Sequence, residues 1–167
     1  ALDPHSASMV ITDVNTGDVL ALVSYPGYDN NKMANGVDAE YFNSLLNDQS
    51  TPMINYATRQ MTAPGSTFKM VSATAGLMEG IITPRSTLFC NGLFDKITPP
   101  ASCLGRHGSL NVTEAINHSC NMFFYEVGYE LGTEGESYSS ELGLEKIRNY
   151  ADLYGLTETT GIEIEES

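Results

Sequence analysis

Basic residues, tryptophan and long apolar runs are what this sequence has least of. The 167 residues contain 8 Lys+Arg against 21 Asp+Glu, a formal charge of −13, and no Trp. Binding nucleic acid or docking on an anionic lipid surface requires a basic face, so this charge argues against both partners. The sequence has no run of about 18 apolar residues that would span a membrane, and it does not begin with a signal-peptide pattern.

Cysteine is also scarce, and its spacing matches no short metal-binding motif. Cys90, Cys103 and Cys120 form no C-x-x-C pair. His118 lies close to Cys120, but residues near them in the chain do not supply four ligands at zinc spacing, so we expect no metal and no cofactor. Two interpretations of the cysteines stay open. One is a Cys90–Cys103 disulfide that closes a Gly/Pro-rich loop in an oxidising compartment, and the other is three buried free thiols.

A β-hairpin followed by several helices is the architecture that the residue pattern predicts. β-Branched residues on both sides of the turn Asn15-Thr16-Gly17 predict a hairpin over residues 8–24. Apolar residues at helical spacing predict helices, and Thr113 is a candidate cap for the third of them. The predicted helices cover residues 39–46, 66–78, 112–131 and 141–153. The expected fold class is therefore α+β (mixed α/β), with a mostly helical region over residues 39–155.

The start of the second predicted helix carries an S-x-x-K sequence, Ser66-Thr67-Phe68-Lys69. A hydroxyl and an ammonium three residues apart lie on one helix face, close enough to exchange a proton. The N–H groups at a helix N-terminus attract an anion, so the Ser66 N–H is a candidate oxyanion donor. Burial lowers the pKa of a lysine, which suits Lys69 as a base. Taken alone, the pattern is weak evidence and is more typical of a capping serine followed by an outward-pointing lysine.

A second polar pair, in Ser119-Cys120-Asn121, follows Ser66 by 53 residues. Its serine supplies a hydroxyl for proton relay, and its asparagine supplies an amide for positioning. A helix cap or an interior polar pair would explain the same residues without chemistry.

Together these motifs resemble the S-x-x-K and S-D-N signature of penicillin-binding proteins and class A β-lactamases, although Ser119-Cys120-Asn121 has Cys where class A β-lactamases have Asp. The chain is similar over nearly its whole length to the N-terminal part of the transpeptidase domain of class B penicillin-binding proteins. The similar stretches are Val14 to Asp29, Ala63 to Met70, His107-Gly108, Glu114-Ala115-Ile116, Ser119-Cys120-Asn121 and Thr160-Gly161-Ile162.

The resemblance implies a role for each of four residues. Ser66 would be the acylated nucleophile, and Lys69 would be its base. Ser119 would relay a proton towards the leaving amine, and Asn121 would hydrogen-bond both Lys69 and the backbone of the substrate. The sequence offers no clear counterpart of the glutamate that deacylates class A β-lactamases, which favours a transferase over a β-lactamase.

The activity that the resemblance implies is that of a peptidoglycan D,D-transpeptidase, which acts on D-Ala–D-Ala stem peptides and is acylated by penicillin and other β-lactams. The parent protein would lie on the extracytoplasmic face of the bacterial cytoplasmic membrane, held by an N-terminal anchor outside this chain. That compartment would permit the disulfide. Two alternatives belong to other functional classes, namely a non-catalytic β-lactam receptor or sensor domain and a degenerate binding scaffold.

The third motif of the family, Lys-Thr/Ser-Gly, is not in the sequence. The four lysines precede Met33, Met70, Ile97 and Ile147. Thr159-Thr160-Gly161 lacks the required cation. We therefore expect residues 1–167 to be a partial transpeptidase domain that lacks the later strands of its sheet and is inactive alone. The open sheet edge would then pair with the missing C-terminal part or with a second copy of the chain.

Overall fold

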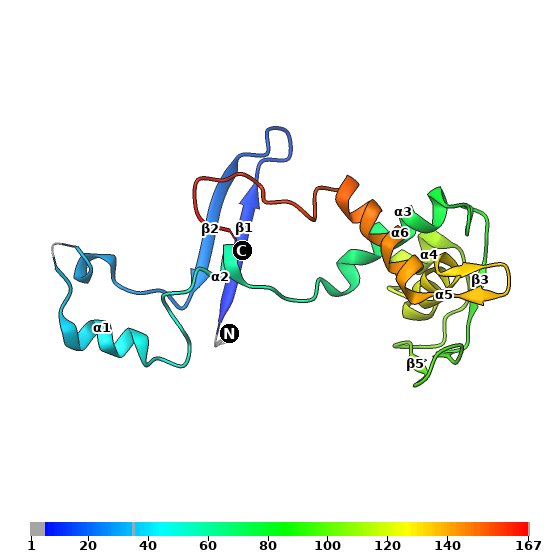
Figure 1. The fold of residues 1–167 in the computed structure, drawn as a ribbon, viewed down its shortest axis with the longest axis horizontal. Coiled ribbons are helices and arrows are strands. Elements are labelled where there is room, and N and C mark those ends of the chain that lie inside the picture. The colour runs from blue at the N-terminus through cyan, green and yellow to red at the C-terminus, as the bar shows by residue number, and fades with distance from the viewer. Residues whose placement is uncertain (1–5, 35, 167) are drawn as a thin grey trace. The chain divides into compact units, whose positions relative to one another are not determined.

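The structure, a computed structural model, describes residues 6–34 and 36–166 and has mixed α and β elements, as predicted (Figure 1). Two units are distinguished by their internal contacts. The first comprises residues 1–62 with residues 161–167, and the second comprises residues 63–160. No helix in the described part of the chain is long and apolar enough to cross a membrane.

The first unit is built on the predicted hairpin. Strand β1 (Ala7–Thr12) pairs with the antiparallel strand β2 (Val19–Tyr25). The turn between them is held by the Asp13 carboxylate, which accepts a hydrogen bond of 2.7 Å from the Asn15 N–H. Gly17 has a φ of +80°, a conformation that costs glycine little and other residues more.

Three short helical segments follow the hairpin in this unit: η1 (Asn30–Lys32), α1 (Ala39–Leu46) and α2 (Tyr56–Arg59). Helix α1 has the predicted bounds, and Asp38 caps it by accepting from the Tyr41 N–H at 2.9 Å. The Ser24 hydroxyl ties β2 to the start of α2, because it donates to the Ile54 carbonyl and accepts from the Tyr56 N–H.

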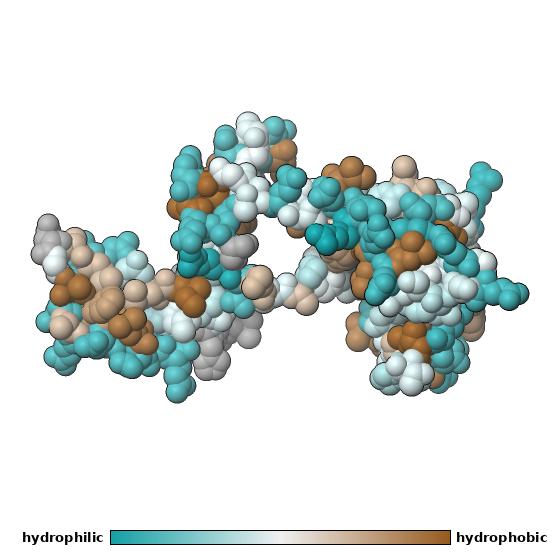
Figure 2. All heavy atoms as spheres, in the orientation of Figure 1, coloured by the Kyte–Doolittle hydropathy of each residue, from teal (hydrophilic) through white to brown (hydrophobic). Residues whose placement is uncertain are grey.

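Apolar side chains of the hairpin remain on the surface. Met9, Leu20 and Val23 are 57%, 65% and 50% exposed. Figure 2 shows hydrophobic residues at the visible surface of this unit. A two-stranded sheet with little cover is marginally stable in water.

The second unit packs helices around a buried core. Its helical elements are η2 (Gly65–Phe68), α3 (Lys69–Met78), α4 (Val112–Asn117), α5 (Asn121–Leu131) and α6 (Ser140–Leu153). Helices α3, α5 and α6 contact one another. Ala75, Val127 and Leu131 are fully buried among them. The approach of α3 to α5 is close at Gly76, where an added Cβ would lie 2.7 Å from the Val127 side chain.

Three pairs of very short antiparallel strands complete this unit, and the sequence pattern did not predict them. They are β3 (Leu88–Cys90) with β6 (Gly108–Leu110), β4 (Leu93–Phe94) with β5 (Ala101–Ser102), and β7 (Thr133–Glu134) with β8 (Ser137–Tyr138). Strands of two or three residues are too short to show an alternating pattern.

The single helix predicted over residues 112–131 is wrong in one respect, because the structure divides it into α4 and α5. The break falls at Ser119, whose φ of +50° does not belong to a right-handed helix. Thr113 is not the cap. Asn111 caps α4 instead, accepting from the Glu114 N–H at 3.0 Å while the Glu114 carboxylate accepts from the Asn111 N–H at 2.9 Å. Cys120 is the N-cap of α5.

Candidate active site

The ammonium of Lys69 is the centre of a hydrogen-bonded group inside the second unit. Lys69 begins α3, and its Nζ donates to the Ser119 carbonyl at 2.7 Å and to the Ser119 Oγ at 2.9 Å. It also donates to Asn121 Oδ1 at 2.6 Å. Two of these acceptors are the side chains that the sequence nominated, so the fold brings three of the four predicted site residues into direct contact.

Ser66, the fourth predicted residue, lies in η2, one turn before Lys69. Its side chain is exposed, and its hydroxyl has no hydrogen-bond partner among residues 6–34 and 36–166. The segment that carries it begins at Gly65, with a φ of +61°, and is fixed by the Thr67 hydroxyl, which donates to the Pro64 carbonyl at 2.7 Å. A free hydroxyl in a tight turn is open to a reacting partner.

An unusual backbone conformation presents the acceptors of Ser119 to Lys69. With a φ of +50°, Ser119 lies in the left-handed region, which costs a residue with a Cβ about 1–2 kcal/mol. Hydrogen bonds on both sides hold the turn: the Ser119 N–H donates to the Ile116 carbonyl at 3.0 Å, and the Cys120 N–H donates to the Ala115 carbonyl at 2.8 Å. The result is that Ser119 and Asn121 both face Nζ.

The surroundings of Lys69 favour its neutral form. Partial burial lowers its pKa below the ordinary value of 10.5, while negative charge on the nearby Cys103 and Cys120 sulfurs acts in the opposite direction. The ring of Phe124 lies 5.7 Å from Nζ and contributes to the apolar wall. The direction of the shift agrees with the prediction that burial would suit this lysine to act as a base.

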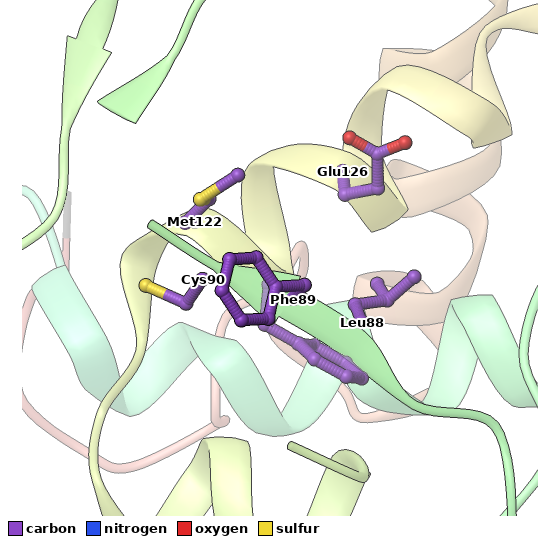
Figure 3. A pocket seen from close by; sticks show the side chains of 6 residues that line it. Leu88, Phe89, Cys90, Met122 and Glu126 are labelled. Carbon is purple, nitrogen blue, oxygen red and sulfur yellow. The ribbon is translucent and has the colours of Figure 1, made fainter. Parts of the chain in front are cut away.

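A cavity of about 200 Å³ opens elsewhere in the same unit (Figure 3). Its lining is mainly apolar and consists of Leu88, Phe89, Cys90, Met122, Phe123 and Glu126. The four predicted site residues do not line it, and its one carboxylate, on Glu126, forms an ion pair with Lys96. The cavity is therefore separate from the candidate reaction site.

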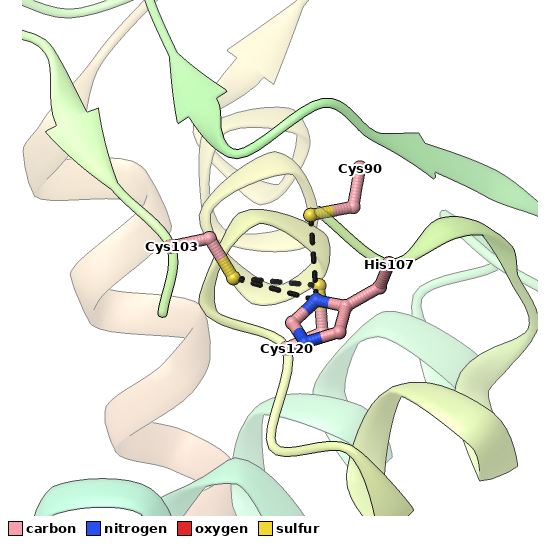
Figure 4. A group of neighbouring side chains, drawn as sticks. All are labelled: Cys90, Cys103, His107 and Cys120. Atoms are coloured by element: carbon pink, nitrogen blue, oxygen red, sulfur yellow. Dashed lines mark hydrogen bonds between the residues drawn. The ribbon is translucent and has the colours of Figure 1, made fainter. Parts of the chain in front are cut away.

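The three cysteines, free thiols in this structure, gather with one histidine beside the Ser119–Asn121 segment (Figure 4). The sulfurs of Cys90, Cys103 and Cys120 and a ring nitrogen of His107 all lie within 4.8 Å of one another. This group is the set of residues in the described chain that could hold a metal. Sequence reasoning missed it because it considered only ligands that are close along the chain, whereas these four come from separate segments.

The thiols in this cluster differ in acidity. Burial raises the pKa of Cys103, but hydrogen bonds from the backbone of Met122, Gly105 and Asn121 outweigh that effect and lower the pKa to about 6. Burial raises the pKa of Cys120 to about 12. The only signal available in the sequence was that every cysteine falls between residues 90 and 120, together with His107 and His118.

A mixed α/β fold in which the lysine of an S-x-x-K motif hydrogen-bonds to an S-x-N segment is typical of the penicillin-recognising serine proteins. Residues 7–167 match the family described as "Penicillin binding protein transpeptidase domain", and the chain belongs to the class B penicillin-binding proteins of this family. It is similar to the peptidoglycan D,D-transpeptidase MrdA of Escherichia coli (strain K12), with 36% identity over 96% of this chain and 24% of that protein. The peptidoglycan D,D-transpeptidase PbpA of Mycolicibacterium smegmatis is 32% identical over 78% of this chain and 28% of its own length.

Solved structures agree with this assignment. PBP2 of Pseudomonas aeruginosa matches with a TM-score of 0.79 and 27% identity, over 94% of this chain and 34% of that chain. The ceftriaxone acyl-enzyme complex of penicillin-binding protein A from M. tuberculosis matches with a TM-score of 0.78 and 26% identity, over 98% of this chain and 37% of that one. The chain spans about a quarter of the length of the curated relatives named above.

Proposed function

We propose that this chain carries the acylation machinery of a peptidoglycan D,D-transpeptidase, with Ser66 as nucleophile and Lys69 as its base. The observation that carries the proposal is the set of three hydrogen bonds from Lys69 Nζ to Ser119 and Asn121. A lysine that pointed outward from a surface helix would place its ammonium in solvent. The ammonium of Lys69 is instead partly buried among three acceptors of the second motif. Membership of the transpeptidase family supports the same assignment.

The chemistry proceeds in two transfers. The Ser66 hydroxyl attacks the carbonyl of the D-Ala–D-Ala peptide and gives its proton to neutral Lys69. Ser119, bonded to Lys69 at 2.9 Å, passes a proton to the leaving D-Ala amine as the peptide bond breaks. An acceptor amine then attacks the Ser66 ester, which forms the cross-link and restores the hydroxyl. Asn121 positions Lys69 and the substrate backbone.

The substrate of the proposed reaction is a peptidoglycan stem peptide, and β-lactams are the inhibitors that acylate the same serine. The parent protein would act on the extracytoplasmic face of the bacterial cytoplasmic membrane. A relative captured as a ceftriaxone acyl-enzyme supports β-lactam acylation as the reaction to test.

Labelling with a fluorescent penicillin tests the proposal in the full-length gene product. We expect one label per chain on Ser66, located by peptide mass spectrometry, and its loss in Ser66→Ala. Ser72→Ala serves as the matched control, because Ser72 lies on α3 and donates only to the Phe68 carbonyl. Labelling that persists in Ser66→Ala would refute the assignment of the nucleophile.

A second assay separates a transferase from a receptor. Protein that has not been labelled is incubated with a depsipeptide substrate, with and without a D-amino acid or stem-peptide amine, and the rate at which the substrate's acyl group passes through Ser66 to the amine is measured. Transfer to the amine is expected of a transpeptidase. An acyl group that stays on Ser66 for as long with the amine as without it would instead indicate a receptor.

The 167 residues alone are expected to react poorly, because the sequence contains no Lys-Thr-Gly or Lys-Ser-Gly segment. Such a segment would supply a second oxyanion donor, and loss of one donor costs about 10²–10³ in rate. Stoichiometric labelling of the isolated chain, at the rate of the full-length protein, would contradict this expectation.

A further inference from the structure

A cavity of about 320 Å³ lies in the first unit, between the loop that follows β2 and the loop that precedes α2. The chain leaves β2, forms η1 and α1, and returns to α2 beside the hairpin (Figure 1). The Ser24 hydroxyl fastens the two loops together through its bonds to Ile54 and Tyr56. The volume is at the lower end of the range for small-molecule sites, which favours a compact ligand.

The side chains around this cavity are polar but uncharged. None of the described residues that line it carries a charge, so a ligand held by a phosphate, carboxylate or ammonium group would find no charged partner. The Tyr28 hydroxyl, the Asn30 amide and the Asn55 Nδ2 have no hydrogen-bond partner in the described part of the chain. Together these groups can both donate to and accept from a neutral ligand.

The backbone around the cavity is poorly suited to bind a peptide strand. Pro26 and Pro52, one on each wall, have no N–H to donate. The Ile54 N–H donates to the Thr51 carbonyl at 3.0 Å, and the Ile54 carbonyl accepts from the Ser24 hydroxyl at 3.2 Å. A peptide that binds as an added strand requires a row of unpaired backbone groups. Recognition therefore depends on the side chains.

The wall that carries Pro52 is held in a strained conformation. Thr51 has a φ of +46°, which is exceptional for a β-branched residue. Its N–H donates to the Asp48 carbonyl at 3.0 Å, and its hydroxyl bonds to the Tyr56 hydroxyl. Strain of this kind persists only where the surroundings fix it, and it is concentrated at sites that hold ligands. The loop is therefore a preformed wall.

The apolar groups at the cavity match a sugar ring with an acetyl group. Pro52 is buried, whereas Tyr28, Met53 and Ile54, which also line the cavity, are each 41% exposed. A tyrosine offers an aromatic face to the C–H face of a sugar and a hydroxyl to the sugar's hydroxyls. An acetamido group has one donor, one acceptor and a methyl group. The amides at the cavity can bond the first two, and the apolar side chains can cover the third.

We propose that the cavity lined by Tyr28, Asn30, Pro52, Met53 and Asn55 binds an uncharged N-acetylated amino sugar, either free or as one unit of a glycan strand. The cavity contains none of the four candidate reaction residues, so it is a second site on the chain. Its occupancy does not require Ser66 to be acylated.

Binding is tested on the full-length gene product by saturation-transfer NMR with N-acetylglucosamine as the probe. We expect a dissociation constant in the millimolar range, with strong transfer to the acetyl methyl protons. Glucose, which has the ring without the acetamido group, should bind about fivefold more weakly or less well still. Absence of transfer to N-acetylglucosamine, or equal binding of glucose, overturns the proposal.

Two further probes identify the class of ligand. N-acetyl-L-alaninamide has acetamido groups without a sugar ring, and tighter binding of this probe than of N-acetylglucosamine would identify a peptide site and overturn the proposal. A β-1,4-linked tetramer of N-acetylglucosamine distinguishes the two sources of the sugar. Tighter binding of the tetramer than of the monosaccharide supports a glycan strand, and equal binding supports a single free sugar.

Substitutions then locate the site. Asn55→Asp keeps the oxygen that caps α2 and removes the NH₂ donor, so it should weaken N-acetylglucosamine binding by about fivefold without unfolding the loop. Tyr28→Ala should weaken binding by at least as much. Asn43→Asp is the matched control, because it introduces the same charge on α1 at a residue that does not line the cavity. Equal affinity in Asn55→Asp and Asn43→Asp contradicts the site.

Hydrogen exchange in the wild-type protein locates the ligand without any substitution. Saturating N-acetylglucosamine should slow exchange of the amides in residues 27–31 and 53–57. Slowing confined to other segments overturns the proposal. Ser66→Ala should bind the sugar as the wild type does, and no step uses a β-lactam, so failure of this proposal and failure of the proposed function are distinguishable.

Discussion

At the scale of single residues, the three N–H donors of the Lys69 ammonium determine which groups the candidate site holds together. A lysine ammonium has three N–H donors, and the Ser119 carbonyl, the Ser119 hydroxyl and the Asn121 amide oxygen together use all three. Ser66 has no share in this group. Loss of one proton leaves a lone pair on Nζ, and only then can the amine accept a proton, as the role proposed for Lys69 requires.

Acylation should therefore depend on pH through Lys69. Burial holds the pKa of Lys69 below 10.5, so the neutral base is populated at lower pH than in a free lysine. The rate of penicillin acylation in the full-length protein is expected to rise with pH and to reach half its plateau below pH 10.5. Lys69→Arg, which keeps the charge and cannot lose it, should reduce the rate by about 10²–10⁴.

Lys146→Arg is the control for this experiment, because Lys146 pairs with Glu79 away from the Ser119–Asn121 segment. It should keep both the rate and the pH profile. A profile for Lys69→Arg that matches the wild type in midpoint and plateau would show that another group is the base.

The left-handed backbone of Ser119 gives a second prediction. Ser119→Gly and Ser119→Ala both remove the hydroxyl, but only glycine is relieved of the conformational cost at a φ of +50°. Ser119→Gly should therefore be more stable than Ser119→Ala by about 1 kcal/mol in chemical denaturation. At His118, where φ is −86°, the same pair should show the reverse order. Equal stability of the two Ser119 variants would mean that the turn relaxes.

Much of this site was predictable, because its candidate residues lie within short sequence motifs. Ser66, Lys69, Ser119 and Asn121 were all named from the sequence, and the contact between Asn121 and Lys69 is confirmed. The cluster of Cys90, Cys103, His107 and Cys120 was not predicted, since its members meet only through tertiary folding. The left-handed backbone at Ser119 could not be predicted from the sequence either, because serine is not among the residues enriched at positive φ.

At the scale of secondary structure, the packing of α3 on α5 positions Lys69 relative to the segment it contacts. Gly76 permits this packing, because an added Cβ would lie 2.7 Å from Val127 and 3.2 Å from Ile82. Both neighbours are buried and cannot move freely. The site therefore depends on a glycine two turns away from its own lysine.

Gly76→Ala is expected to destabilise the chain by about 1–3 kcal/mol through overpacking. Gly128→Ala is the matched control on α5, where an added Cβ meets nothing within 4 Å, so the better helix propensity of alanine should stabilise by up to about 1 kcal/mol. Thermal or denaturant unfolding of both variants measures the difference. If the two substitutions had effects of the same sign, helix propensity and not packing would control this interface.

Helix prediction succeeded where periodicity was continuous and failed where a turn interrupted it. The bounds of α1 and most of α6 follow from apolar spacing. Residues 112–131 carry apolar spacing throughout, yet α4 and α5 are separate helices. The apolar spacing of the sequence does not reveal this break. The turn at Ser119 is formed by backbone hydrogen bonds that resemble those of a helix end, and such bonds do not depend on the apolar pattern.

At the scale of the whole molecule, the hairpin and the helical unit differ in how well they cover their apolar residues. Met9, Leu20 and Val23 are at least half exposed, whereas Phe123, Val127 and Leu131 are at most 2% exposed. The exposed edges of β1 and β2 are open to pairing with further strands. We therefore expect the hairpin to be the part of the chain whose stability depends most on pairing with strands from further polypeptide.

Hydrogen exchange on the 167-residue chain and on the full-length gene product tests this dependence. Amides of β1 and β2 are expected to exchange within seconds in the short chain and to be strongly protected in the longer one. Amides in the buried part of α5 should be protected in both, which makes them the internal reference. Hairpin amides protected equally in both chains would show that β1 and β2 need no further strands.

All four candidate reaction residues and the cluster of Cys90, Cys103, His107 and Cys120 lie in one uninterrupted stretch, residues 63–160, while the other unit is assembled from two separate segments, residues 1–62 and 161–167. For genetic exchange between related genes, this arrangement has a direct consequence. A crossover near residue 62 combined with one near residue 160 transfers the four candidate reaction residues and the cysteine–histidine cluster as one inherited block. A crossover inside the block separates Ser66 and Lys69 from Ser119 and Asn121, and leaves contacts that did not evolve together.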